Sequence, residues 1–354
     1  QLQNEVLLGS GIKSSTMSVN SSHFYSRYDG HDIDLLTIAL EKLRDSHSGV
    51  IFLAGDSSLD NKFWFNQYAP AVNGYEGILN PPEMKTDVCY YLNYEAERRG
   101  ARHLCCLNTA VEASSLNSRA CCCLLAQDAF IRDNISNNDY LVVSVGGNDI
   151  ALNPLLMTVL NLILLSWFTP VACLDHCACA CPVNSHIDGG CCTCGLPGCI
   201  SGFLCGWPPA MGYFVELFQH RVRNYVMRLL SKAKPKKLII CMIYYLDETA
   251  TGSWADCALG CMCYNCFPYR LQTAIRTVFR LATQNIRIPG TEVVAFPLFD
   301  VLNGRTSSDY LQRVEPSPQG AQKMAVALLN AILGAEPTLV SAPVSQVMGA
   351  RGNA

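Results

Sequence analysis

Five short apolar runs, separated by segments with helical spacing, constrain the fold of this chain most. Each run is apolar throughout rather than alternating with polar residues, which is typical of strands buried on both faces of a parallel sheet. The runs cover residues 50–54, 103–107, 140–145, 237–244 and 291–296. Strands that alternate with helices favour right-handed crossovers and helices on both sheet faces. The sequence therefore predicts an α/β fold, a doubly wound three-layer α/β/α sandwich with a five-stranded parallel sheet.

The segments around these runs have apolar residues at intervals of three and four, as amphipathic helices do. The expected helices cover residues 37–44, 85–99, 115–132, 212–233, 268–283 and 318–333. The last two begin with proline, whose missing N–H costs nothing in the first turn of a helix. Ligands of doubly wound sheets bind outside the carboxyl ends of the strands, so we expect functional residues there.

Length and composition favour one large domain. The chain has 354 residues, of which 50% are hydrophobic and 16% charged, as suits a protein with a sizeable core. We assign residues 50–335 to this domain, residues 1–49 to an N-terminal extension with the first helix, and residues 336–354 to a C-terminal tail. The first 35 residues have no clear place in the core. Residues 167–209, rich in Cys, Gly and Pro, form an insertion too long for an ordinary loop.

Charge and hydropathy limit the partners. A formal net charge of −3, a pI of about 6.2 and no dense basic cluster disfavour nucleic-acid binding. The longest uncharged stretch, residues 150–172, is interrupted by Pro154 and Pro170. A spanning helix needs about 20 consecutive apolar residues, so we expect a buried helix or a lid rather than a membrane span. The Leu-rich part, residues 155–168, leaves a lipid-handling protein as a further hypothesis.

Two short motifs follow the first and the third run. Gly55-Asp56-Ser57 is expected to form a tight turn that presents the Ser57 hydroxyl at the carboxyl edge of the sheet, near the start of a helix. In Gly147-Asn148-Asp149, the glycine lets the backbone approach a ligand, and the Asn148 carboxamide can donate to a developing oxyanion. Either motif alone is compatible with a simple capping or tight turn. Together, at the expected strand ends, they favour a catalytic site.

In these motifs, the chain resembles the SGNH (GDSL-type) hydrolases, over roughly residues 50–333. The resemblance implies a flavodoxin-like sheet and a serine ester hydrolase of the esterase or lipase type, which acts on a small acyl ester and needs no cofactor. Ser57 would be the nucleophile, with its backbone N–H in the oxyanion hole, and Asn148 the side-chain oxyanion donor. The family's second block has a glycine whose N–H faces the oxyanion. Ala113 stands at that position, keeps the N–H and is expected to adopt an ordinary φ.

The fourth block departs from the family pattern Asp-x-x-His. Gln312 and Glu315 occupy the two positions, and no histidine follows His220. A serine nucleophile needs a base whose pKa is near the working pH, and glutamate's ordinary pKa is about two units below that of histidine. Burial can raise it. In one interpretation, Glu315 is such a tuned base. In the other, it is a carboxylate that interacts with the dipole of the helix beginning near Pro318, and hydrolysis is vestigial.

The second interpretation makes the chain a catalytically inactive SGNH-like pseudoenzyme. Such a protein would serve as a binding module, or as a structural subunit that contacts a protein partner in a larger assembly.

Other polar residues allow further predictions. Asp60, one turn beyond Ser57, either faces the pocket or stabilises the start of a helix. Asp309 either orients Arg313 or has no role in the site. Arg221, in the middle of a helix, is expected at the surface.

Two groups among the twenty cysteines allow predictions. Those in apolar patterns are expected to act as small hydrophobic residues; they are Cys105, Cys106, Cys121, Cys122, Cys123 and Cys241. The second group, in the insertion, lies beside histidines and has ligand types that suit zinc; the candidate ligands are Cys173, His176, Cys177, Cys191 and Cys194. Disulfides and free thiols remain alternatives there, since the irregular spacing does not decide between them.

Overall fold

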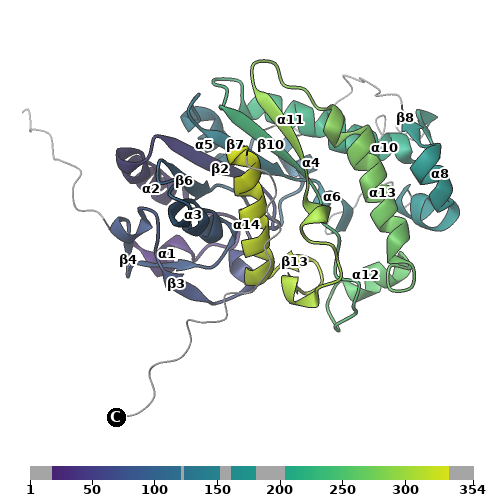
Figure 1. The fold of residues 1–354 in the computed structure, drawn as a ribbon, viewed down its shortest axis with the longest axis horizontal. Helices are drawn as coiled ribbons and strands as arrows, with labels where there is room; N and C mark the ends of the chain where they lie inside the picture. Colours follow the sequence, from purple (N-terminus) through teal and green to yellow (C-terminus); the bar gives the residue numbers. More distant parts are fainter. Residues whose placement is uncertain (1–17, 121–122, 152–160, 181–203, 335–354) are drawn as a thin grey trace, which may run out of the picture.

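The computed structural model describes residues 18–120, 123–151, 161–180 and 204–334. At its centre lies a five-stranded sheet with the order β6-β2-β7-β10-β11, in which every pairing is parallel (Figure 1). The strands are β2 (Gly49–Gly55), β6 (Leu104–Asn108), β7 (Tyr140–Ser144), β10 (Lys237–Met242) and β11 (Glu292–Pro297). Numbered along the chain, this order is 2-1-3-4-5, the flavodoxin-like order. The predicted fold class is confirmed.

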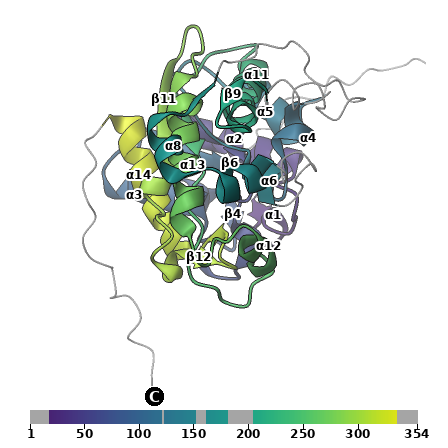
Figure 2. The same cartoon turned by 90° about the vertical axis from the view of Figure 1, so that its right-hand side faces the viewer.

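Helices cover both faces of this sheet (Figure 2). One face carries α3 (Val88–Arg98) and α14 (Pro318–Leu333), and the other carries α2 (Ile33–Ser46), α5 (Ala126–Asn134) and α11 (Val222–Leu229). Neighbouring strand residues point to opposite faces. Ile51 thus packs in the core beneath α3 and α14, whereas Phe52 packs in the core on the other face. Fully buried strands explain why the runs are apolar throughout.

Helix ends agree with the sequence where end signals are present. The structure has α14 with the predicted bounds, capped by the Ser317 hydroxyl, which accepts from the Gly320 N–H at 3.2 Å. Gly334 ends this helix in the left-handed conformation that glycine adopts readily. Four further predicted helices also form. They are α2, α3, α13 (Pro268–Leu281) and a continuous helix made of α10 (Met211–Val215), the π-helical η4 (Glu216–Arg221) and α11.

The single helix expected over residues 115–132 is wrong. Two helices stand there, α4 (Leu116–Ala120) and α5. The Asp149 carboxylate accepts from the N–H groups of Leu116 and Asn117, at 2.6 and 3.0 Å, and so fixes the start of α4. The buried Arg119 side chain then reaches Asp128 of α5. Tertiary contacts therefore override the helical periodicity.

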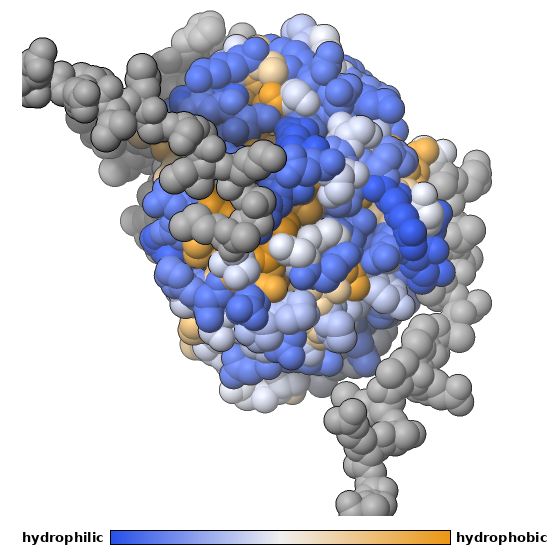
Figure 3. Space-filling model, turned by 90° about the vertical axis from the view of Figure 1, so that its left-hand side faces the viewer, coloured by the Kyte–Doolittle hydropathy of each residue, from blue (hydrophilic) through white to orange (hydrophobic). Residues whose placement is uncertain are grey.

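The N-terminal part contributes to the core. Strand β1 (Val19–Asn20) pairs with β4 (Leu79–Asn80), and α1 (Ser21–Phe24) follows it. Phe24 and Tyr25 are buried in the same core as α2. The prediction that the first 35 residues have no clear place in the core is therefore wrong for residues 18–35. Strand β3 (Tyr68–Pro70) pairs with β5 (Glu83–Lys85) nearby. Most of this side of the molecule is hydrophilic, with a group of hydrophobic residues near its middle (Figure 3).

Part of the expected insertion packs beside α13. The described residues there form α8 (Val171–His176) and the pair of β8 (Cys179–Ala180) with β9 (Gly206–Trp207). Residues 152–160 of the uncharged stretch lie outside the described ranges, whereas Leu162 and Leu165 are buried in the core. Within the described ranges, no helix is both long and apolar enough to cross a membrane.

Candidate active site

Ser57 lies in a turn directly after β2. The turn needs glycine at position 55, because a Cβ there would clash with the backbone oxygen of Ser144, at a distance of 2.5 Å. The Asp56 carboxylate accepts from the N–H and the hydroxyl of Ser58, at 3.1 and 2.7 Å, and closes the turn. The expected helix start is a single turn, followed by the short 3-10 helix η1 (Lys62–Trp64). The Ser57 hydroxyl therefore sits at the carboxyl edge of the sheet, as predicted.

The Ser57 hydroxyl donates a hydrogen bond to Glu315 Oε1, with an Oγ–Oε1 distance of 3.1 Å. Glu315 belongs to β13 (Glu315–Pro316), which pairs with β12 (Tyr310–Leu311) just before α14. Both side chains are buried. The start of α14 is capped by the Ser317 hydroxyl and not by Glu315. The Glu315 carboxyl instead accepts from the Ser57 hydroxyl.

Burial raises the pKa of Glu315 to about 8. The hydrogen bond from Ser57 opposes this rise, and the negative charge of Asp56 adds to it. Glu315 Oε2 is buried and has no hydrogen-bond partner among the described residues. Gln312, at the position of the family's aspartate, is exposed. The arrangement is thus a serine–glutamate pair rather than a serine triad.

The Asn148 and Ala113 segments meet beside this pair. Asn148, in α6 (Gly147–Ala151), donates from Nδ2 to the Ser114 backbone oxygen at 3.0 Å. The Val111 N–H donates to the Gly55 oxygen at 2.9 Å, so the loop is held at both ends, with Ala113 between them.

Ala113 does not have the expected ordinary φ. Its φ is +54°, in the left-handed region that a side chain with a Cβ disfavours by about 1–2 kcal/mol. The short loop must reverse direction between its two anchors, which explains why glycine suits this position.

An apolar cavity of about 260 Å³ opens beside the serine. Ser57, Asn148 and Glu315 form its polar end, near the carboxyl end of β10. Its walls come from residues 162–165, from α12 (Asp256–Cys261) and from α10, η4 and α13. Large apolar side chains line these walls, among them Leu162, Leu165, Phe214, Phe218, Leu271 and Ile275. A cavity of this kind fits an apolar group better than a charged one.

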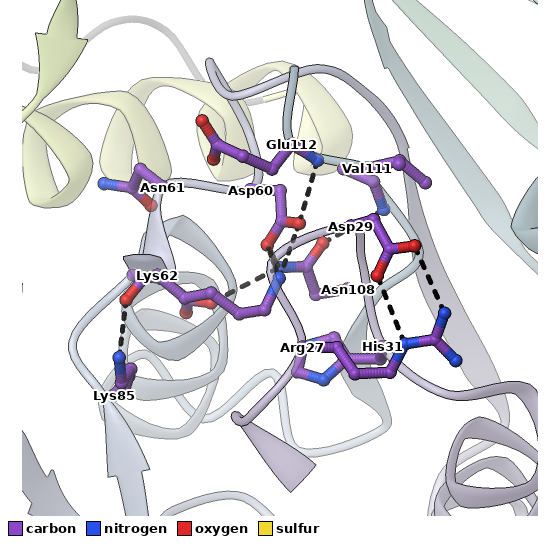
Figure 4. Close-up of polar contacts among 12 residues, drawn as sticks. Arg27, Asp29, His31, Asp60, Asn61, Lys62, Lys85, Asn108, Val111 and Glu112 are labelled. Atoms are coloured by element: carbon purple, nitrogen blue, oxygen red, sulfur yellow. Dashed lines mark hydrogen bonds and ion pairs between the residues drawn. The ribbon is translucent and has the colours of Figure 1, made fainter. Parts of the chain in front are cut away.

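The predictions for the other polar residues have mixed outcomes. Asp60 does not face the cavity; it forms a buried ion pair with Lys62, whose Nζ lies 2.6 Å from both carboxylate oxygens (Figure 4). Asp309 pairs with Lys323 at 2.6 Å, while the Arg313 guanidinium binds elsewhere. Its Nη1 lies 2.7 Å from the Asp256 carboxylate.

The surface position expected for Arg221 is wrong. This side chain is buried and pairs with Glu216 at 2.8 Å. One turn of helix brings the two together, because η4 is π-helical and places residues five apart on one face.

Sequence reasoning missed Glu112 and Lys62, which lie close to the serine turn. Both are buried, and Figure 4 shows them on either side of Asp60. The one available signal was position, since Glu112 follows β6 immediately before Ala113.

The cysteines of the described ranges are free thiols. Cys105, Cys106 and Cys241 are buried as predicted, whereas Cys123 is exposed, contrary to the expectation. Cys121 and Cys122 lie outside the described residues.

The zinc hypothesis stays open. Cys173 and Cys177 are described as free thiols, but Cys191 and Cys194 lie outside the described ranges. The part of the chain that the structure describes has no group of three or more His, Cys, Asp or Glu placed to hold a metal ion. The proposed ligand set with His176 therefore remains a prediction.

Comparison with protein-family models and with curated proteins gives no match. Solved structures do match. An acetylxylan esterase from Geobacillus stearothermophilus is 12% identical, over 81% of this chain and 95% of its own, with a TM-score of 0.40. An extracellular lipase from Streptomyces rimosus is 10% identical, over 81% of this chain and 100% of its own, with a TM-score of 0.39. A protein described as a GDSL-like lipase from Parabacteroides merdae is 14% identical, over 81% and 96%, with a TM-score of 0.37. The likeness of this chain to GDSL-type esterases and lipases is one of fold alone.

Proposed function

We propose that this chain is a serine ester hydrolase that acts on esters with an apolar acyl group. The observation that carries the proposal is the 3.1 Å hydrogen bond from Ser57 to Glu315 at the polar end of an apolar cavity. A nucleophile bonded to a group that can take its proton is the basic unit of acyl transfer through a serine. The raised pKa of Glu315, about 8, suits a base that works near neutral pH.

Each part of the site has a role in this reaction. Ser57 Oγ attacks the acyl carbon while its proton moves to Glu315 along the existing hydrogen bond. The oxygen that becomes negative accepts from the Asn148 carboxamide and from the backbone N–H groups of Ser57 and Ala113. The acyl chain lies in the cavity, against its apolar walls. The bond to the alcohol then breaks, and the alcohol leaves with the proton held by Glu315. In the second half, water bonds to the acyl carbon and gives a proton to Glu315, the bond from that carbon to Ser57 Oγ breaks, and Oγ regains the proton from Glu315.

A chain-length series of p-nitrophenyl esters tests the proposal. Purified protein is expected to hydrolyse the butanoate and octanoate faster than the acetate, because the longer chains fill the apolar cavity. Ser57→Ala is expected to abolish turnover, whereas the control Ser231→Ala, at an exposed position, keeps it. Absence of turnover on every ester, or full turnover by Ser57→Ala, would contradict the proposal.

The rate of hydrolysis is expected to rise with pH. Only the deprotonated Glu315 carboxylate can accept the proton of Ser57, and burial raises its pKa to about 8. The deprotonated fraction therefore grows about tenfold per pH unit below that value and is complete above it. For p-nitrophenyl esters, kcat/KM is expected to rise with pH and to level off above about 8. A profile that is flat from acid to neutral pH would exclude Glu315 as the base.

A second candidate function is binding without catalysis, as a binding module or a subunit of an assembly. The same raised pKa supports it, because most Glu315 carboxyls hold a proton at neutral pH and cannot act as a base. The cavity would then hold an apolar ligand. Tight binding of a fluorescent fatty acid by both the unaltered protein and Ser57→Ala, without ester turnover by either, would favour this function.

A further inference from the structure

Arg313 is a buried cation in the turn between β12 and β13. It is 1% exposed, and its Nε and Nη2 donate to the Asp247 backbone oxygen at 3.1 and 2.9 Å. Nη2 also donates to Asn265 Oδ1 at 3.0 Å, and Nη1 donates to the Asp256 carboxylate at 2.7 Å. Asp256 belongs to α12, which lies beside β13 in Figure 1. The guanidinium therefore joins this turn to the loop after β10 and to a helix of the cavity wall.

The turn has a backbone conformation that its own residues disfavour. Its φ is +51° at Gln312 and +68° at Arg313. A side chain with a Cβ disfavours this left-handed region, which glycine adopts readily. Such a conformation persists only where the surrounding structure holds it. The Arg313 side chain supplies these contacts, together with the Asp247 N–H, which donates to the Arg313 backbone oxygen at 3.0 Å.

This turn sets the position of the Glu315 carboxyl. Arg313 precedes Glu315 by two residues, and between them the Val314 oxygen accepts from the hydroxyl of the buried Tyr244 at 2.6 Å. Among the described residues, Ser57 is the one hydrogen-bond partner of the Glu315 carboxyl, since Oε1 accepts from it and Oε2 has no partner. In a serine triad, an aspartate orients the base through a hydrogen bond. In the described structure no side chain does this for Glu315, so the direction of its carboxyl depends on the backbone of β13.

We propose that Arg313 is a positioning residue that holds the Glu315 carboxyl within hydrogen-bond reach of the Ser57 hydroxyl. This role rests on the ester hydrolase function proposed above. Arg313 acts through the backbone: its guanidinium fixes the disfavoured turn, and the turn directs Glu315 at the serine. Arginine suits this role, because its planar fork donates hydrogen bonds in fixed directions to a backbone oxygen and to a carboxylate at once. It thus does the work of the family's aspartate, whose position Gln312 occupies here.

Arg313→Lys is expected to lower kcat/KM for p-nitrophenyl butanoate by about 10–100-fold, because a displacement of about 1 Å at a reacting group costs up to about 100-fold. Lysine keeps the buried positive charge for Asp256 but has no fork, so it cannot hold the turn to both neighbours. Thermal unfolding shows whether the variant is folded at the temperature of the assay. The control is Arg280→Lys, at an exposed position of α13, with an unchanged kcat/KM.

A double-mutant cycle with Glu315→Gln separates positioning from a merely structural role. If Arg313 acts through Glu315, adding Arg313→Lys to Glu315→Gln removes little more activity, because the base is already absent. We expect this second loss to be less than about threefold, against about 10–100-fold in the unaltered background. A merely structural role would lower the rate by the same factor in both backgrounds.

Two variants of Gln312 test the turn itself and leave the buried arginine in place. Gln312 is exposed, so replacing it costs no packing. Valine is β-branched and strongly disfavours a positive φ, whereas glycine adopts it readily. We expect kcat/KM of Gln312→Val to be about three- to tenfold below that of Gln312→Gly. In the Glu315→Gln background, the two variants are expected to differ by less than about twofold.

The outcomes distinguish this role from the proposed function. Equal factors in the two backgrounds, or no loss in either Arg313→Lys or Gln312→Val, would overturn the positioning role and leave the proposed function standing. If Arg313→Lys does not fold, the comparison of Gln312→Val with Gln312→Gly in both backgrounds decides. Failure of the unaltered protein to hydrolyse any p-nitrophenyl ester would overturn both.

Discussion

Replacing Glu315 with glutamine is expected to lower kcat/KM for p-nitrophenyl butanoate by about 10²–10⁴-fold, the usual contribution of a general base. Glutamine has nearly the same shape and still accepts the hydrogen bond from Ser57, which Glu315 now receives at 3.1 Å. It cannot take the proton, so the serine attacks as a neutral hydroxyl. The matched control is Glu41→Gln on the exposed side of α2, with an expected rate equal to that of the unaltered protein.

Glu315→His completes this test, because it supplies a different base in the same place. The ordinary pKa of histidine is about 6.5, and burial lowers it further. The pH at which the rate levels off is therefore expected to move from about 8 to below about 7. Thermal unfolding of each variant separates a loss of the base from a loss of the fold. Full activity of Glu315→Gln would show that Glu315 is not the base.

The sequence allowed most of the sheet to be predicted, because a strand that is buried on both faces is apolar along its whole length. In β2, Ile51 and Phe52 pack in different cores, so neither face of the strand tolerates a polar residue. The bounds of α14 were also predictable, because the residues at its two ends, Ser317 and Gly334, are themselves signals for a helix start and a helix end. The boundary between α4 and α5 has no such local signal. It depends on Arg119, whose partner Asp128 is brought near by the fold.

The site was predictable only in part, for a related reason. Ser57 and Asn148 follow strands in recognisable motifs, and Glu315 stands at a fixed offset before a helix. The sequence shows that these residues belong to one edge of the sheet, but not how far burial changes their pKa. Glu112 shows this best, since its pKa of about 9 results from its surroundings in the folded chain. Its position directly before Ala113 was the one signal in the sequence, and that position does not reveal the burial that changes the pKa.

Lys62→Met is expected to destabilise the fold by about 3–5 kcal/mol, the usual cost of leaving a buried charge without its partner. Asp60 is 0% exposed and Lys62 is 1% exposed, so water reaches neither group. The Asp60 carboxylate also accepts from Asn108 Nδ2 and from the Glu112 N–H, each at 3.1 Å, but neither donor carries a charge. Methionine fills a similar volume, so the change removes the ammonium group rather than the packing.

Urea denaturation of three variants tests this expectation and isolates the charge. Lys62→Met should unfold at a much lower urea concentration than the unaltered protein. Arg132→Gln, which breaks an exposed ion pair with Asp133, should unfold close to it. The double variant Lys62→Met with Asp60→Asn should regain much of the lost stability, because it no longer buries an unpaired charge. If the double variant is less stable than Lys62→Met, the cost lies in the bonds of Asp60 to Asn108 and to the Glu112 loop. Asp60 would then act by tying the nucleophile turn to the Ala113 segment, and kcat/KM on p-nitrophenyl esters would fall in that variant together with stability.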